Sequence, residues 1–80
     1  MTVLIGSFRG GGHNTVASII VPGAGQVGTI LRCTNRGGRV DRYEIVVGER
    51  THVVPVADDA TNARVEAMEI AQAMARTVSA

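Results

Sequence analysis

The chain has no lysine and no tryptophan, and its 80 residues include one cysteine, one phenylalanine and one tyrosine. Because Cys33 is the single cysteine, the chain cannot form an intramolecular disulfide. Cys33 also does not form, with the two histidines, the clustered ligand set of a structural zinc site. Two aromatic residues are few for a single-strand nucleic-acid binder, which stacks bases on several rings. No apolar run approaches the length of a membrane span, so we expect no membrane association.

The beginning of the chain, residues 1–6, has no basic stretch and only a short apolar one. We therefore expect no signal peptide and a cytoplasmic location. Arginine as the only basic residue, together with abundant Ala, Val and Gly, fits a GC-rich genome such as that of an actinobacterium or one of its phages. The length predicts a single domain over residues 1–80, small enough that association with another copy would enlarge its core.

Turn-forming residues divide the first part of the chain at regular intervals, at 9–14, 22–25, 35–38 and 47–50. Between and after them lie five candidate strands, at 3–8, 15–21, 27–34, 39–47 and 51–56. Gly48 at the first central position of the last turn suits a type II′ hairpin. Pro55 places the fifth strand at a sheet edge or at a strand end, because proline costs a ladder hydrogen bond.

A helix is predicted over residues 58–78, with Asp58 or Asp59 as its N-terminal cap. Its apolar stripe comprises Ala63, Ala67, Ile70, Ala71, Met74 and Val78. The predicted fold class is α+β: an antiparallel four- to five-stranded meander sheet followed by one C-terminal α-helix packed on one face. The alternative is a small β-barrel plus the same C-terminal helix.

Near-continuous apolar runs at 15–21, 45–47 and 53–56 favour strands that are buried on both faces. Because the single helix can cover only one face, we expect another copy of the chain or a partner on the other. The candidate oligomer interface consists of Ile19, Ile20, Val21, Val46 and Val53.

Charge is distributed unevenly, with four arginines and no acid in residues 1–40, and four arginines against seven acids in residues 41–80. In a meander, the loops at 9–14 and 35–38 lie at the same end of the sheet. The candidate anion- or partner-binding residues there are Arg9, Gly10, Gly11, Gly12, His13, Arg36, Gly37, Gly38 and Arg39. The alternative interpretation is that the glycines only form hairpin turns and that the arginines pair with Asp41, Asp58 or Asp59.

No catalytic constellation is visible, because neither His13 nor His52 has an acid or nucleophile at a fixed spacing. Cys33 follows Arg32, whose charge could lower the pKa of the thiol. The alternative interpretation is that Cys33 is a small buried hydrophobic side chain. We therefore predict no enzyme activity, no cofactor and no metal. The predicted function is that of a small non-enzymatic homo-oligomer, most simply a dimer, which binds another protein as a regulatory or inhibitory accessory protein. The alternative is a small nucleic-acid- or anion-binding domain that uses the Gly/Arg loops.

Overall fold

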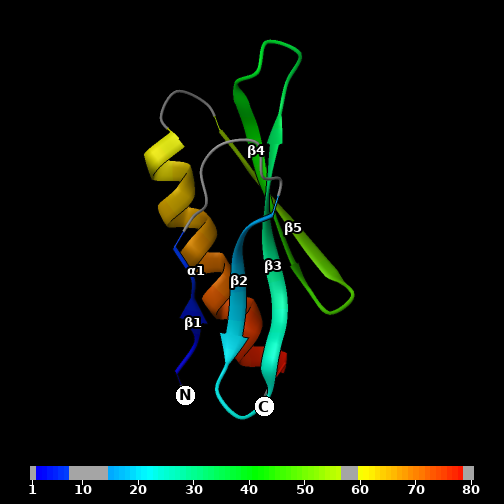
Figure 1. The fold of residues 1–80 in the computed structure, drawn as a ribbon, viewed down its shortest axis with the longest axis vertical. Helices are drawn as coiled ribbons and strands as arrows, with labels where there is room; N and C mark the ends of the chain where they lie inside the picture. The colour runs from blue at the N-terminus through cyan, green and yellow to red at the C-terminus, as the bar shows by residue number, and fades with distance from the viewer. Residues whose placement is uncertain (1, 8–14, 57–59, 79–80) are drawn as a thin grey trace.

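The computed structural model describes residues 2–7, 15–56 and 60–78, which form one antiparallel sheet and one helix (Figure 1). The elements are β1 (Leu4–Ile5), β2 (Thr15–Val21), β3 (Gly25–Thr34), β4 (Val40–Val47), β5 (Arg50–Pro55) and α1 (Ala60–Val78). The strands lie in chain order, and each is antiparallel to the next. This arrangement confirms the predicted meander and C-terminal helix. The described strands leave β1 and β5 as two edges, so they do not close into the alternative barrel.

Two tight turns show why the strands reverse where they do. The amide of Ala24 donates to the carbonyl of Val21 at 2.9 Å, and Gly23 has a φ of 92°. Proline followed by a glycine of positive φ is the pattern of a type II turn. In the β4–β5 turn Gly48 has a φ of 61°, while no described residue other than glycine has a positive φ. This is the φ pattern of the predicted type II′ hairpin.

The element bounds differ from the predicted ones mainly at β1. Only Leu4 and Ile5 form strand pairs, with Ile20 and Ile19, whereas a strand was predicted over 3–8. The amide of Gly6 makes one further bond, to the carbonyl of Ser18 at 3.2 Å, and residue 8 lies outside the described residues. The predicted helix start and its cap, residues 58 and 59, also lie outside them.

A β-bulge in β2 explains why neighbouring residues of that strand are both buried. Thr15 is opposite Leu31 and Ala17 is opposite Ile30, so Val16 is the extra residue in β2. Val16 and Ala17 are 0% and 4% exposed, although adjacent residues of a regular strand point to opposite faces. Part of the apolar run at 15–21 therefore serves a single face.

The core lies between the sheet and α1, which packs mainly against β4. From the sheet it contains Val16, Ala17, Ile19, Val21, Ile30, Tyr43, Ile45, Val47 and Val54, and from the helix it contains Ala63, Ala67, Ala71 and Ala75. Alanines allow the helix backbone to approach the sheet closely. Because four residues turn about 40° beyond one full rotation, the alanine line wraps slowly around the helix.

This line corrects the predicted stripe at its C-terminal end. Ala75 is fully buried although it lies outside the predicted stripe, because it continues the four-residue spacing of the other alanines. Val78, the last residue of α1, is 47% exposed. Ile70 and Met74 pack at the margin of the core.

Arg50 ties the β4–β5 hairpin to the end of the helix. Its Nη2 donates to the carbonyl of Met74 at 2.9 Å and to the hydroxyl of Thr77, which itself donates to the same carbonyl at 2.7 Å. A cation at a helix C-terminus interacts favourably with the helix dipole. This contact fixes the first residue of β5 relative to α1.

Candidate functional site: the open sheet face, the β5 edge and the β3–β4 tip

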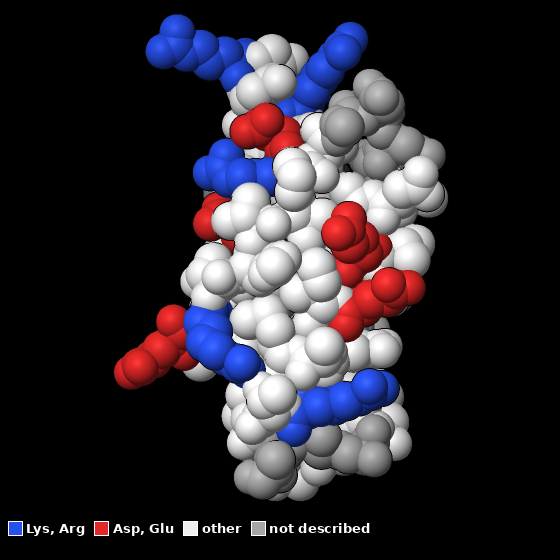
Figure 2. Space-filling view, turned by 180° about the vertical axis from the view of Figure 1, so that it is seen from behind, with Lys and Arg blue, Asp and Glu red and all other residues white. Residues whose placement is uncertain are grey.

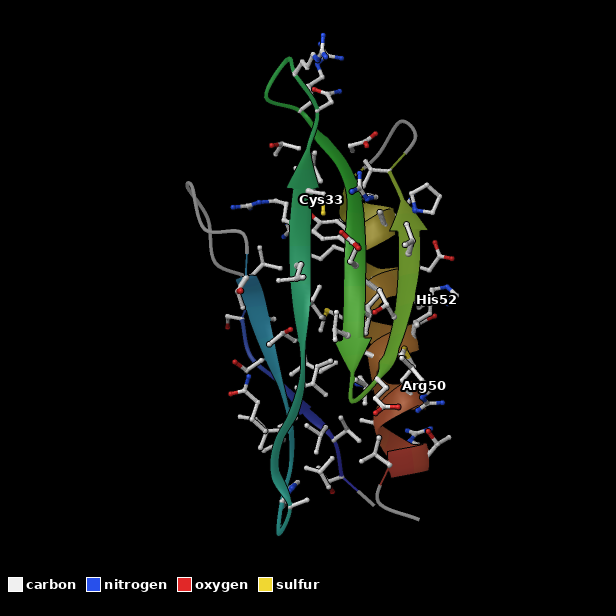
Figure 3. All side chains as sticks on the ribbon, turned by 90° about the vertical axis from the view of Figure 1, so that its right-hand side faces the viewer. Cys33, Arg50 and His52 are labelled. Atoms are coloured by element: carbon white, nitrogen blue, oxygen red, sulfur yellow. The ribbon has the colours of Figure 1, made fainter. Side chains whose placement is uncertain are left out.

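The sheet face away from α1, called here the open face, is the surface that the described fold leaves uncovered (Figure 3). Ile20, Val46 and Val53 of the predicted interface belong to it. Ile19 and Val21 do not, since both are buried beneath α1. Alternation along β2 separates them from Ile20, so only three of the five predicted interface residues share a surface.

The open face is mixed rather than apolar. Its aliphatic side chains are Leu4, Ile20, Leu31, Val46 and Val53, and its hydroxyl side chains are Thr15, Ser18, Thr29 and Thr51. Leu4, Ile20 and Val53 are 50%, 37% and 47% exposed, while Leu31 and Val46 are already partly covered by their neighbours. The expectation of a sheet that is apolar on both faces is therefore corrected, because threonine, serine and charged residues occupy much of the second face.

A polar cluster occupies the end of the open face near the β3–β4 turn. The thiol of Cys33 donates to Oε2 of Glu44 at 2.8 Å. Arg42 lies 3.1 Å from Asp41 and 3.6 Å from Glu44, measured from guanidinium nitrogen to carboxylate oxygen. Burial raises the pKa of the Cys33 thiol, and the hydrogen bond to Glu44 and the charge of Glu44 raise it further, against an opposing effect of Arg42. The thiol is therefore held protonated, and the lowered pKa considered from the sequence is not found.

Cys33 lies on β3 and His52 on β5, with β4 between them (Figure 3). Cys33 is opposite Arg42 on the open face, whereas His52 is opposite Ile45 on the face that packs against α1. The described structure therefore does not bring the thiol and the imidazole together as a nucleophile and a base.

Within the part of the chain that the structure describes, the outer edge of β5 carries backbone groups that pair with no other strand. The amide of Val56 donates to the carbonyl of Asp41 at 2.9 Å, which identifies residues 41 and 56 as a hydrogen-bonded pair. Such pairs alternate along an antiparallel ladder. Counting back by twos, Val54 and His52 bond to β4, whereas Thr51, Val53 and Pro55 direct their backbone groups outward. Proline therefore costs no ladder bond here, because its missing N–H would face away from β4.

The β3–β4 turn presents two arginines but few free amides. The side-chain oxygen of Asn35 accepts from the amides of Gly37 and Arg39, at 2.9 and 3.2 Å. The amide of Gly38 donates to the carbonyl of Asn35 at 3.0 Å. These amides are therefore used within the turn rather than offered to an anion, although the sequence predicted an amide-lined site.

Arg36 and Arg39 are exposed at this turn, called here the β3–β4 tip (residues 35–39), which forms one end of the molecule (Figure 1). Within the described part of the chain, neither guanidinium has an ion-pair or hydrogen-bond partner. The remaining predicted residues of this site, Arg9, Gly10, Gly11, Gly12 and His13, lie outside the described residues.

Among the residues that the structure describes, no three His, Cys, Asp or Glu side chains gather closely enough to hold a metal ion. The described helix is not long and apolar enough to cross a membrane. No family model, curated protein or solved structure was found to match this chain.

Proposed function

We propose that the chain is a non-enzymatic protein-interaction module that assembles with a second copy of itself. The observation that carries this proposal is that a single helix covers one sheet face, while Leu4, Ile20 and Val53 remain exposed on the other. A domain of this length buries a smaller share of its surface than a larger domain does, and association with another copy is a common way to cover more of it.

The size of the apolar contribution limits how the two copies can join. Covering the exposed parts of these three aliphatic side chains yields roughly 1 kcal/mol each, which is about 6 kcal/mol for the six side chains of two copies. A micromolar dimer needs about 8 kcal/mol. The open face alone therefore falls short, and additional interactions, such as backbone hydrogen bonds, have to contribute to the association.

We further propose, as the role of this assembly, that it acts as a small accessory protein of the regulatory or inhibitory kind. Such proteins work by occupying a surface of another protein, and the described side chains provide contact surface rather than a catalytic pair. This role rests on the self-assembly and would be examined by capture experiments in the native host.

Light scattering coupled to gel filtration, over a series from low to high micromolar protein, tests the self-association. We expect the mean mass to rise from one chain to two. If the two copies pack through the open face, Ile20→Ser should weaken the association, because it removes exposed aliphatic surface from that face. Val65→Ser is the matched control, since Val65 is 51% exposed on α1, away from this face. A strict monomer at high micromolar concentration would exclude the proposal.

A second candidate function is the binding of a polyanion at the β3–β4 tip, favoured by the exposed and unpaired Arg36 and Arg39. Arginine forks match phosphate oxygens, and such binding weakens steeply with salt. Fluorescence anisotropy with a labelled DNA duplex at low salt would test it. The double variant Arg36→Ala, Arg39→Ala should lose the binding, and absent or salt-independent binding by the unmodified chain removes the candidate.

A further inference from the structure

We propose that two copies join edge to edge through β5, around a two-fold axis that passes between Val53 of one copy and Val53 of the other. The two sheets would then form one continuous antiparallel sheet. This inference rests on the proposed self-association and specifies its interface. It commits to a second copy of this chain as the occupant of the β5 edge.

The hydrogen-bonding groups of the edge are complementary to themselves under a two-fold rotation. Thr51 and Val53 each direct an N–H and a C=O outward, and Pro55 directs a C=O outward. With Val53 opposite Val53 of the second copy, each Val53 amide meets a Val53 carbonyl. Each Thr51 amide then meets the carbonyl of Pro55 in the other copy. Four backbone hydrogen bonds result, and no donor on either edge strand lacks an acceptor.

Neighbouring registers fit the described side chains less well. A shift that places His52 opposite His52 of the second copy also allows four bonds, but it sets two titratable rings against each other and leaves Pro55 outside the pairing. The opposite shift, with Val53 opposite Pro55, allows only two bonds, because proline has no N–H. The chosen register also brings the half-exposed Val53 side chains into contact on the open face.

The charge pattern favours a second copy over a charged peptide. Residues 51–55 contain no acidic or basic side chain apart from His52, which lies on the helix side. Figure 2 views the molecule from the β5 side: an uncharged band crosses the middle of that surface, with acidic side chains to its right and further charged side chains at its left margin and toward both ends. Charged side chains are one feature by which proteins protect edge strands from pairing, and residues 51–55 lack it apart from His52. Proline is another such feature, but in the chosen register Pro55 still accepts a hydrogen bond through its carbonyl, so the edge is suited to pairing with a neutral strand.

The other edge of the sheet is a weaker candidate. β1 consists of two paired residues, Leu4 and Ile5, whereas β5 offers six. A short edge strand is itself a device against pairing. β5 is therefore the edge on which a second strand gains the most backbone bonds.

Cysteine cross-linking tests both the interface and its register. In a Cys33→Ala background, each of the variants Thr51→Cys, His52→Cys and Val53→Cys is oxidised at micromolar concentration and analysed on non-reducing gels. Opposed residues of a hydrogen-bonded pair have Cα atoms about 5.5 Å apart, within disulfide range. Val53→Cys should form a covalent dimer. Thr51→Cys is the matched control on the same face and strand, and it should not, because its two copies lie roughly 14 Å apart along the strands.

Cross-linking of His52→Cys in preference to Val53→Cys would overturn the proposed register. Equal cross-linking of all three variants would indicate random collision and would overturn the interface itself.

A second pair of variants separates the edge from the open face. Val53→Pro removes an outward-directed N–H that makes no bond to β4. Because Pro55 already occupies an equivalent outward-directed position of β5, we expect the circular dichroism spectrum to show that the fold is kept. We expect dimerisation to weaken about tenfold or more, because two hydrogen bonds are lost. Val53→Thr keeps the amide and the branched shape and should keep most of the dimer.

If Val53→Pro remains as dimeric as the unmodified chain while Ile20→Ser becomes monomeric, the β5 interface is wrong and self-association through the open face stands. If the unmodified chain is monomeric at all concentrations, the proposed function fails together with this interface.

Discussion

Cys33 shows how one side chain can be kept unreactive by its neighbours. Partial burial and the hydrogen bond to Glu44 raise the pKa of its thiol, so less of the reactive thiolate is present at neutral pH than in a free cysteine. Alkylation by iodoacetamide should therefore be slower than that of free cysteine, with its pH profile displaced upward. Rates measured from neutral to alkaline pH provide the check.

Three variants make this prediction specific. Glu44→Gln should lower the thiol pKa and speed alkylation, because it removes the acceptor charge. Asp41→Asn should act in the same direction but less, since Asp41 makes the smallest contribution. Arg42→Gln should slow alkylation, because the guanidinium opposes the rise. A profile at or below that of free cysteine would contradict the assigned environment.

Gly28 occupies a place in β3 where no side chain fits. A Cβ atom added there would overlap the carbonyl oxygen of Val46 and lie 2.9 Å from Cγ2 of Val47. Because the first of these neighbours is backbone of the adjacent strand, the overlap cannot be relieved by a rotamer change. Gly28→Ala should lower the free energy of unfolding by roughly 3 kcal/mol, measured by urea denaturation. Gly6→Ala is the control, since nothing lies within 4 Å of its added Cβ and we expect a change within about 0.5 kcal/mol.

At the scale of elements, the close approach of α1 to the sheet depends on its alanine line. Ala67 is fully buried, so Ala67→Leu forces the helix away from β4 and should cost roughly 2 kcal/mol of unfolding free energy. Ala73 lies on the exposed side of the same helix, where leucine should change stability by less than about 0.5 kcal/mol. Thermal and urea unfolding of the two variants would provide the measurement. Equal losses would mean that the change acts through helix propensity rather than packing.

The elements were predictable where local chemistry decides them. Pro22-Gly23 and Gly48 fix their turns by backbone preference, and the four-residue spacing of alanines marks the helix. The short β1 was not predictable, because its length depends on pairing with β2 rather than on its own residues. Asn35 was overlooked in the β3–β4 tip, although an asparagine two residues before a glycine is a recognised sign that its side chain will bond to the turn amides.

At the scale of the whole molecule, the apolar runs in the sequence led to an overestimate of the apolar sheet surface that has to be buried. A continuous apolar run such as Ile19-Ile20-Val21 does not show which of its alternating residues face the helix. Residues of the buried face and residues of the open face therefore look alike in the sequence. The bulge at Val16 places one further residue in the core, and this shift follows from the pairing of β2 with β3. Pro55 indicated from the sequence that β5 lies at a sheet edge or a strand end. The outward direction of the Thr51 and Val53 amides could be assigned only from the pairing register of β4 and β5.

The proposed dimer makes the stability of the molecule depend on concentration. Only folded chains associate, so dimerisation stabilises the folded state relative to the unfolded chain. The midpoint of thermal unfolding should therefore rise by several degrees between low and high micromolar protein concentration. Since residues 51–55 of the β5 edge carry no acidic or basic side chain apart from His52, this rise should be nearly the same in low and high salt. Differential scanning fluorimetry over both series checks it, with Val53→Pro as the variant that should lose the concentration dependence. A rise that disappears in high salt would instead place arginine contacts, such as those of the β3–β4 tip, in the interface.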